Sequence, residues 1–264
     1  MKPGSKTRVA ILSILSVGAI SVGALALLPI AAITLFRMRR VYAAVATRLA
    51  RLVLRLWGIR MIVHQEAPFP RTQTVYISNH TSTLDLFILV ALGLPNTRFF
   101  LSGFLRKHVP LGIIAYLMGT FFTVPQHRPA ERTRIFQRAD RILRRTRESV
   151  YLSPEGGRIT TGEIGHFNKG AFHLATSLNA PIVPMYFHIP SAVDPGMGFD
   201  AGTGSVHVYV KPAISTDHWQ LEELEQNKEC VRDLFVEWHQ EIRGINHGEP
   251  SHRSVVLPAA LEAR

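Results

Sequence analysis

Two short polar segments carry the residue types that could do chemistry, and each directly follows an apolar stretch. The first runs from Asn79 to Asp85, follows residues 75–78, and contains a histidine and a carboxylate. The second runs from Pro154 to Arg158, follows residues 150–152, and places a carboxylate and two glycines ahead of an arginine. A general base and an anion-binding turn together indicate an enzyme that activates a hydroxyl on a phosphate-bearing substrate.

His80 and Asp85 are five positions apart, and five residues rotate by about 140° on an ideal helix. They can therefore meet only if His80 precedes a helix and Asp85 lies in its first turn, with Thr81 or Ser82 as the cap. Neutral His80 would then remove a proton, while Asp85 would accept the other ring N–H and stabilise the imidazolium. The alternative is a polar turn with a structural histidine and a helix-terminal aspartate.

The second segment predicts an anion clamp. Gly156 and Gly157 allow a tight turn that brings backbone N–H groups to a ligand. Arg158 offers a planar fork that suits phosphate, and Glu155 is expected to hold the turn or to accept a hydrogen bond from a substrate hydroxyl. No Walker A loop is present, so nucleotide phosphoryl transfer is not expected. The alternative is an ordinary glycine turn with a surface arginine.

The charge distribution favours a lipid surface over nucleic acid. The net charge is +11 and 47% of the residues are hydrophobic. Residues 1–60 carry ten Lys/Arg and no Asp/Glu, whereas the remaining residues carry twenty and nineteen. This basic excess lies where anionic lipid head groups would meet it, and no nucleic-acid-binding pattern is present. The single cysteine, Cys230, excludes an internal disulfide and a Cys-based metal site, and fits a reducing compartment.

The N-terminus predicts a membrane-associated helical segment. Residues 9–36 form 28 positions without a charge, more than the roughly 20 that span a bilayer. We expect this segment to tilt, to break at Pro29 or to lie partly in one leaflet. A cleaved signal peptide is the alternative, but its apolar region would be only about 7–15 residues long. More positive charge follows the segment than precedes it, which predicts a membrane protein with its catalytic domain in the cytoplasm.

Two further segments have a basic, amphipathic pattern. Apolar residues from Val45 to Leu56 recur at helical spacing beside arginines 48, 51 and 55, which predicts a basic helix at a membrane surface. The alternative is a helix that covers the core. Residues 132–145 are also rich in arginine, and these form either a solvated face or a contact with membrane or an acidic acyl carrier.

The remaining pattern predicts an α/β domain, with a mostly parallel central sheet flanked by helices. The expected strands are 75–78, 99–102, 121–124, 150–152, 181–187 and 205–210, and the expected helices are 83–92, 113–118, 132–145, 171–177 and 220–243. Residues 189–204 are rich in glycine and proline and predict a loop. The predicted division is a membrane-anchoring helical segment at 1–57, the α/β domain at 58–215, and a C-terminal helix with a loose tail at 216–264.

The two motifs, in this order and about seventy residues apart behind a hydrophobic N-terminus, resemble the glycerolipid acyltransferase family. The nearest type is 1-acylglycerol-3-phosphate acyltransferase. The resemblance covers roughly residues 58–212. Two further blocks agree with it: residues 167–171 resemble the Phe-x-x-Gly element of the family, and residues 180–185 resemble its proline-containing strand.

The resemblance implies transfer of an acyl chain from acyl-CoA or acyl-carrier protein to the free hydroxyl of a lysophospholipid, most simply 1-acylglycerol-3-phosphate to give phosphatidic acid. It implies His80 and Asp85 as catalytic residues, with no metal and no cofactor. The candidate substrate-binding residues are Glu155, Gly156, Gly157, Arg158, Arg128 and Lys169. The implied partners are the bilayer, the lysophospholipid and the acyl donor.

Two departures from the family pattern leave the acceptor open. Gly157 stands where threonine is frequent, and the apolar block after Gly119 leads to Pro125, so that Arg128 is the nearest arginine. A lyso-aminolipid or another lysophospholipid is therefore an alternative acceptor. A lipid hydrolase is a rival activity, but a Gly-x-Ser-x-Gly motif is absent. A membrane-bound lipid-binding protein without enzymatic activity is the other rival.

Overall fold

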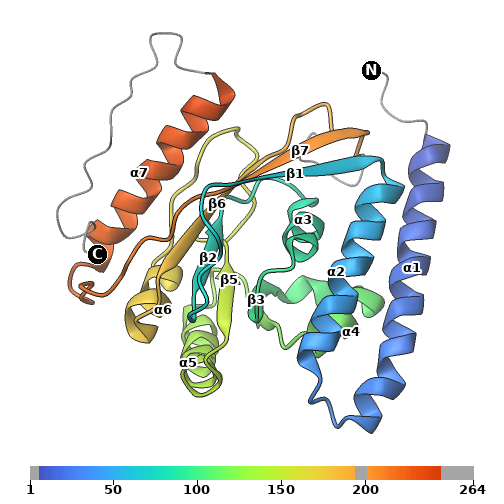
Figure 1. The fold of residues 1–264 in the computed structure, drawn as a ribbon, viewed down its shortest axis with the longest axis horizontal. Helices are drawn as coiled ribbons and strands as arrows, with labels where there is room; N and C mark the ends of the chain where they lie inside the picture. The colour runs from blue at the N-terminus through green and yellow to red at the C-terminus, as the bar shows by residue number, and fades with distance from the viewer. Residues whose placement is uncertain (1–5, 194–200, 245–264) are drawn as a thin grey trace.

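The computed structural model describes residues 6–193 and 201–244. Its centre is a seven-stranded sheet in the order β1-β7-β6-β2-β5-β3-β4 (Figure 1). The strands are β1 (Ile59–Gln65), β2 (Val75–Ser78), β3 (Thr97–Ser102), β4 (Phe121–Thr123), β5 (Ser149–Leu152), β6 (Ile182–His188) and β7 (Gly204–Val210). The helices are α1 (Lys6–Ile33), α2 (Arg39–Leu56), α3 (Asp85–Leu92), the 3₁₀ helix η1 (Gly103–Lys107), α4 (Val109–Leu117), α5 (Pro129–Thr146), α6 (Gly170–Leu178) and α7 (Leu224–Arg243).

The sheet is mostly parallel, as the sequence predicts. Every neighbouring pair is parallel except β6 and β7. β2 lies between β5 and β6, with Val75 opposite both Val150 and Ile182. All residues of β2 and β5 are buried, because helices cover both faces of the sheet. Since β2 and β5 run in parallel, the two polar motifs that follow them leave the sheet at the same edge.

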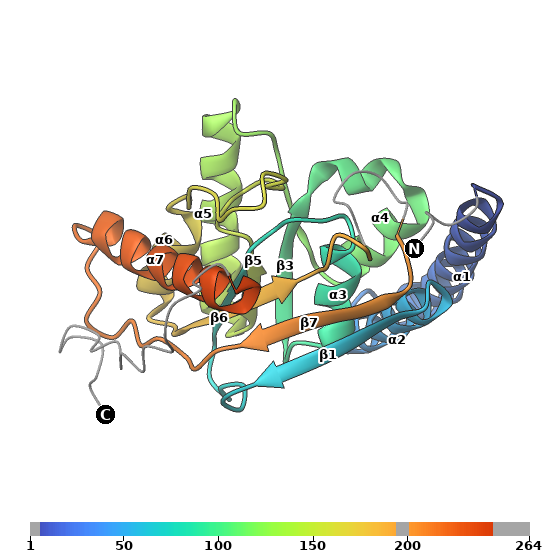
Figure 2. The ribbon, with the colours of Figure 1, turned by 90° about the horizontal axis from the view of Figure 1, so that it is seen from above.

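Helices cover the two faces of the sheet in separate layers. One face packs on α1, α2, α3 and α4, and the other packs on α5, α6 and α7 (Figures 1 and 2). Side chains alternate along β2, so Tyr76 belongs to the first core, whereas Val75 and Ile77 belong to the second. Phe235 of α7 is fully buried in the second core, so the C-terminal helix packs on the α/β domain.

Some predicted elements differ from the structure. The strand β1 was not predicted, because it lies at the sheet edge and its polar residues, including His64 and Gln65, interrupt the apolar pattern. The predicted break at Pro29 is wrong, since α1 continues to Ile33. Parts of the predicted loop and tail, residues 194–200 and 245–264, lie outside the described residues.

The helix α2 lies between α1 and the domain, where it covers the core. Its buried face includes Tyr42, Ala46 and Ala50, and its Arg51 and Thr47 donate hydrogen bonds to the end of α3. The structure therefore favours the alternative of a core-covering helix over the predicted surface helix. Of the larger apolar residues in the predicted stripe, Val53 is buried and Val45, Leu49 and Leu56 pack against the core, whereas Leu52 is exposed.

The helix α1 has one face packed on the protein and one face of exposed apolar side chains. Near the middle of α1 the indole Nε1 of Trp57 donates to Ser16 Oγ at 3.0 Å, and just after the helix Thr34 and Tyr42 share a hydrogen bond. Residues including Ile14, Leu25 and Ile33 point outward and are exposed. Within the described residues, α1 is the one helix long and apolar enough to cross a membrane.

Removing the hydrogen bond between Ser16 and Trp57 tests how much it contributes to the packing of α1 on the domain. We expect Ser16→Ala to lower the free energy of unfolding by about 1–3 kcal/mol, because it leaves a buried indole N–H without an acceptor. Ser21→Ala is the control, since that hydroxyl bonds only to Val17 O within α1. Chemical denaturation in detergent measures both, and equal effects of the two changes would contradict this role of Ser16.

Candidate active site

The carboxylate of Asp85 organises the turn that carries His80. Asp85 is the first residue of α3 and is 3% exposed. Its Oδ2 accepts hydrogen bonds from Nδ1 of His80 at 2.7 Å and from the backbone N–H groups of Thr81 and Ser82 at 2.8 and 2.9 Å. The predicted meeting of His80 and Asp85 across a turn is therefore confirmed.

The imidazole of His80 is oriented by this bond and remains accessible. Its side chain is 35% exposed. Asp85 occupies Nδ1, so the proton of the ring is held on that nitrogen in the neutral form, and Nε2 carries the lone pair. Among the described residues Nε2 has no hydrogen-bond partner. This is the geometry that a general base requires.

The buried side chain of Glu155 connects the two motifs. It is 4% exposed, and its carboxylate accepts hydrogen bonds from the backbone N–H of His80 at 2.6 Å and of Gly165 at 2.9 Å. Burial raises the pKa of Glu155 to about 7, while these two N–H groups oppose the shift. The N–H of Ile159 also donates to His80 O at 2.8 Å. Of the two predicted roles, the structure supports the one in which Glu155 holds the turn.

The glycine turn depends on Gly156 more than on Gly157. Gly156 has a φ of +67°, and a Cβ there would lie 2.7 Å from Nδ2 of Asn168. Asn168 donates from the same nitrogen to the carbonyl oxygens of Pro154 and Glu155, both at 3.0 Å. Gly157 has open space where a side chain would begin. Gly156 is therefore needed for the turn, whereas Gly157 leaves room beside Arg158.

Arg158 reaches across to the turn of the first motif. Its Nη1 donates to Oγ1 of Thr83 at 2.6 Å, and Thr83 lies between His80 and Asp85. The guanidinium is exposed, so its other N–H groups are accessible to a ligand. The structure thus brings the histidine, its carboxylate and the arginine of the clamp together, as predicted.

Arg128 and Lys169 lie in ion pairs away from these contacts. Arg128 is exposed at the start of α5 and pairs with Glu131 at 3.5 Å. Lys169 precedes α6 and pairs with Glu225 at the start of α7 at 2.9 Å, so it links two helices. Neither contacts the described polar groups around His80. Within the described residues, no group of three or more His, Cys, Asp or Glu could hold a metal ion.

Asn79 has a structural role that the sequence analysis did not assign. Its buried amide donates to Phe187 O at 3.0 Å and accepts from Phe187 N at 2.7 Å. These two bonds tie the end of β2 to β6, at the point where the strand turns towards His80. A polar residue directly after a buried strand was the available signal, because such a group needs a partner.

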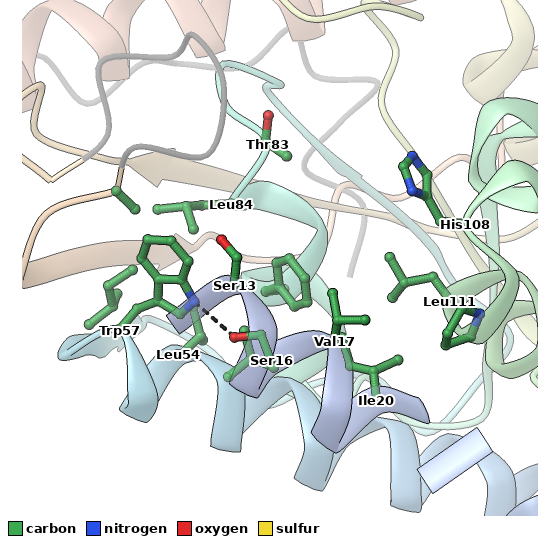
Figure 3. Close-up of a pocket in the computed structure, with 15 residues that line it drawn as sticks. Ser13, Ser16, Val17, Ile20, Leu54, Trp57, Thr83, Leu84, His108 and Leu111 are labelled. Atoms are coloured by element: carbon green, nitrogen blue, oxygen red, sulfur yellow. Dashed lines mark hydrogen bonds between the residues drawn. The ribbon is translucent and has the colours of Figure 1, made fainter. Parts of the chain in front are cut away.

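An apolar cavity of about 270 Å³ lies beside this turn (Figure 3). Thr83 and Leu84 form one wall, Leu54 and Trp57 of α2 form another, and Val17 and Ile20 close it from α1. The cavity therefore adjoins the residue that Arg158 contacts. Its walls come from the first motif and from the two N-terminal helices. The apolar cavity therefore lies next to the polar groups of the site.

Comparisons with known proteins agree with this combination of fold and site. The family model described as Acyltransferase matches residues 60–188. The chain is 30% identical over 210 residues to the 1-acyl-sn-glycerol-3-phosphate acyltransferase of Saccharomyces cerevisiae, over 78% of this chain and 67% of that protein. It is 28% identical to the protein of the same name from Limnanthes alba, over 70% of this chain and 65% of the relative. The chain thus spans about two thirds of the length of these relatives.

The solved structures include a protein with the same fold. The crystal structure of the 1-acyl-sn-glycerophosphate (LPA) acyltransferase PlsC from Thermotoga maritima has a TM-score of 0.73 and 16% identity, and the match covers 90% of this chain and 97% of that one. A histidine–aspartate pair at the carboxyl edge of a mostly parallel sheet defines the class of site. The chain belongs to the glycerolipid acyltransferase family.

The two hydrogen bonds that Glu155 accepts from the backbone of His80 and Gly165 can be tested with a side chain of the same size. We expect Glu155→Gln to lower kcat by about tenfold or more and to reduce stability by about 1–3 kcal/mol, because the amide NH₂ cannot accept one of the two backbone N–H groups. Steady-state kinetics and thermal unfolding measure the two effects. Glu163→Gln, an exposed change in the same loop, is the control. Wild-type kcat in Glu155→Gln would show that His80 does not depend on these two bonds.

Proposed function

We propose that this chain transfers an acyl group to the free hydroxyl of a lysophospholipid, most simply 1-acylglycerol-3-phosphate to give phosphatidic acid. The observation that carries the proposal is the accessible imidazole of His80, held on Asp85 and placed beside Arg158. A base next to a phosphate-binding cation suits an acceptor that carries both a hydroxyl and a phosphate. The relatives from Saccharomyces cerevisiae and Limnanthes alba are named for the same activity.

In this mechanism His80 acts first as a base and then as an acid. Its Nε2 takes the proton of the acceptor hydroxyl as the oxygen attacks the thioester carbonyl of the donor. The C–S bond then breaks, and the leaving thiolate receives the proton from the imidazolium. Asp85 stabilises the transient positive charge and keeps the ring oriented.

The head group and the acyl chain have separate places in this proposal. Arg158 binds the acceptor phosphate with the help of the backbone at Gly156 and Gly157. The apolar cavity beside Thr83 accommodates an acyl chain, because its wall is made by apolar side chains of α1 and α2 (Figure 3). The donor is acyl-CoA or acyl-carrier protein.

The outward face of α1 supports attachment to a membrane. Its inward face packs on the protein from Ser16 to Ala31, so the helix cannot leave the domain without exposing that contact. We therefore propose that α1 lies with its exposed apolar side chains in one leaflet, where the lipid substrates are found. The excess of positive charge after the apolar segment supports a cytoplasmic catalytic domain.

His80→Ala tests the activity and the role of the base together. The purified variant should fold like the wild type and should lose roughly 10²–10⁴-fold in kcat, as expected for removal of a general base. The assay supplies a panel of lysolipids with acyl-CoA or acyl-carrier protein and measures diacyl product. His173→Ala, at an exposed position of α6, is the control. Wild-type turnover by His80→Ala would refute the base, and release of free fatty acid alone would indicate a hydrolase.

Arg158→Ala tests the phosphate clamp separately. We expect the KM of the acceptor to rise by about 10- to 100-fold with a smaller change in kcat, which corresponds to the loss of about 1.5–3 kcal/mol from a charge-assisted bond. The KM of the donor should remain near its wild-type value. Arg141→Ala removes an exposed arginine of α5 and serves as the control. An unchanged acceptor KM would remove Arg158 from the binding site.

A further inference from the structure

A second pocket lies at the amino-terminal ends of the strands, opposite the carboxyl-terminal ends where His80 is found. It has a volume of about 440 Å³ and is formed by the turn from Phe36 to Val41, between α1 and α2, together with four residues of the domain: Asn96, Arg98, Thr146 and Glu148. These four precede or begin β3 and β5, or end α5. The α1–α2 turn lies at the lower end of both helices in Figure 1. The pocket is therefore separate from the site around His80.

The pocket carries more positive charge than its carboxylate neutralises. Arg39 and Arg98 both form ion pairs with Glu148, and they also donate to the carbonyl oxygens of Met118 and Gly119. Burial, with the neighbouring Arg98 and Arg40, lowers the pKa of Arg39 to about 10. Arg37 and Arg40 add two exposed guanidinium groups with no ion pair among the described residues. The lining of the pocket thus contains four arginines and one carboxylate.

Backbone N–H groups add to the positive electrostatic potential of this pocket. The helix α2 begins at Arg39 inside the pocket, with no side-chain cap and no acidic residue in its first turn. The first N–H groups of a helix lack intrahelical partners and carry a partial positive charge, which favours an anion. An 18-residue helix therefore presents an uncompensated positive end to the same space as the arginines.

The pocket wall also contains a buried hydroxyl without a partner. Oγ1 of Thr146 is inaccessible and makes no hydrogen bond to any described residue. A buried donor without an acceptor is unfavourable, and a change of the Thr146 rotamer would turn the hydroxyl towards an anion in the pocket that this residue lines. This feature is independent of the arginines and of the helix end, and it points to the same kind of ligand.

Apolar side chains beside the pocket indicate that the anion belongs to a lipid. Leu35 and Phe36 are exposed by 68% and 57%, and they continue the apolar face of α1 at Ile33, which is 83% exposed. An anion-binding pocket next to this surface fits an amphiphile. We propose that the pocket binds the phosphate of an anionic phospholipid in the leaflet that α1 contacts. This proposal depends on the membrane contact of α1 and not on the chemistry at His80.

The test measures binding of the full chain to phosphatidylcholine vesicles with and without phosphatidic acid. Thr146→Val keeps the shape and the charge but removes the hydroxyl, and we expect it to weaken binding to the acidic vesicles by about tenfold, as for loss of a charge-assisted bond. Its thermal stability without lipid should equal or exceed that of the wild type, because valine removes the unpaired buried hydroxyl. Arg40→Gln should weaken the same binding more than Arg48→Gln, which removes an equal charge from an exposed position of α2 outside the pocket.

Three results would overturn the proposal. Wild-type binding by Thr146→Val would show that the hydroxyl meets no ligand. Equal losses in Arg40→Gln and Arg48→Gln, of about fivefold each, would show only the general attraction of basic residues to acidic lipid. If inorganic phosphate protected the wild type against thermal unfolding as strongly as the acidic vesicles do, and this protection were lost in Thr146→Val, the pocket would be assigned to a soluble anion.

Discussion

Two buried carboxylates impose the constraint on which the site depends. Asp85 and Glu155 are almost fully covered, and a buried carboxylate is tolerated only where donors surround it. Most of these donors are backbone N–H groups, from Thr81 and Ser82 for Asp85 and from His80 and Gly165 for Glu155. Because backbone groups cannot move independently of the chain, satisfying the carboxylates fixes the path of the turn. The position of the imidazole is a consequence of that path.

The sheet supplies the framework that makes this possible. β2 and β5 are parallel and adjacent, so residues about seventy positions apart leave the sheet side by side. Just after β2, the side chain of Asn79 forms two hydrogen bonds with the backbone of Phe187 in β6. These bonds continue the pairing of the two strands past the end of β2. The turn that carries His80 is therefore anchored to β5 through Glu155 and to β6 through Asn79. Rigid strands on both sides allow a short loop to hold a defined geometry.

The N-terminal helices combine a face packed on the α/β domain with an exposed apolar face. α1 gives one face to the core and leaves the other face apolar and exposed, an arrangement that is unfavourable in water. The inward face builds the wall of the cavity beside Thr83, whereas the outward face continues to the arginine-lined pocket at the α1–α2 turn. In the proposed arrangement, contact of α1 with a bilayer would be coupled by packing to both ends of the sheet. The same helix would then serve both membrane attachment and access to the cavity.

The sequence by itself determined the class of fold and the chemistry of the two motifs. Buried strands such as β2 and β5 are continuous apolar runs, and the turn between His80 and Asp85 is closed by local hydrogen bonds, so both are encoded over a few residues. The edge strand β1 was not predicted, and the core-covering position of α2 was only the alternative to a surface helix, because long-range packing and not local periodicity decides both. Only the tertiary structure showed that Glu155 accepts from the backbone of His80, that Lys169 pairs with Glu225, and that Arg39 and Arg98 share Glu148. Hydrogen bonds and charges between distant segments depend on how the strands are ordered, and strand order leaves no periodic signal in the chain.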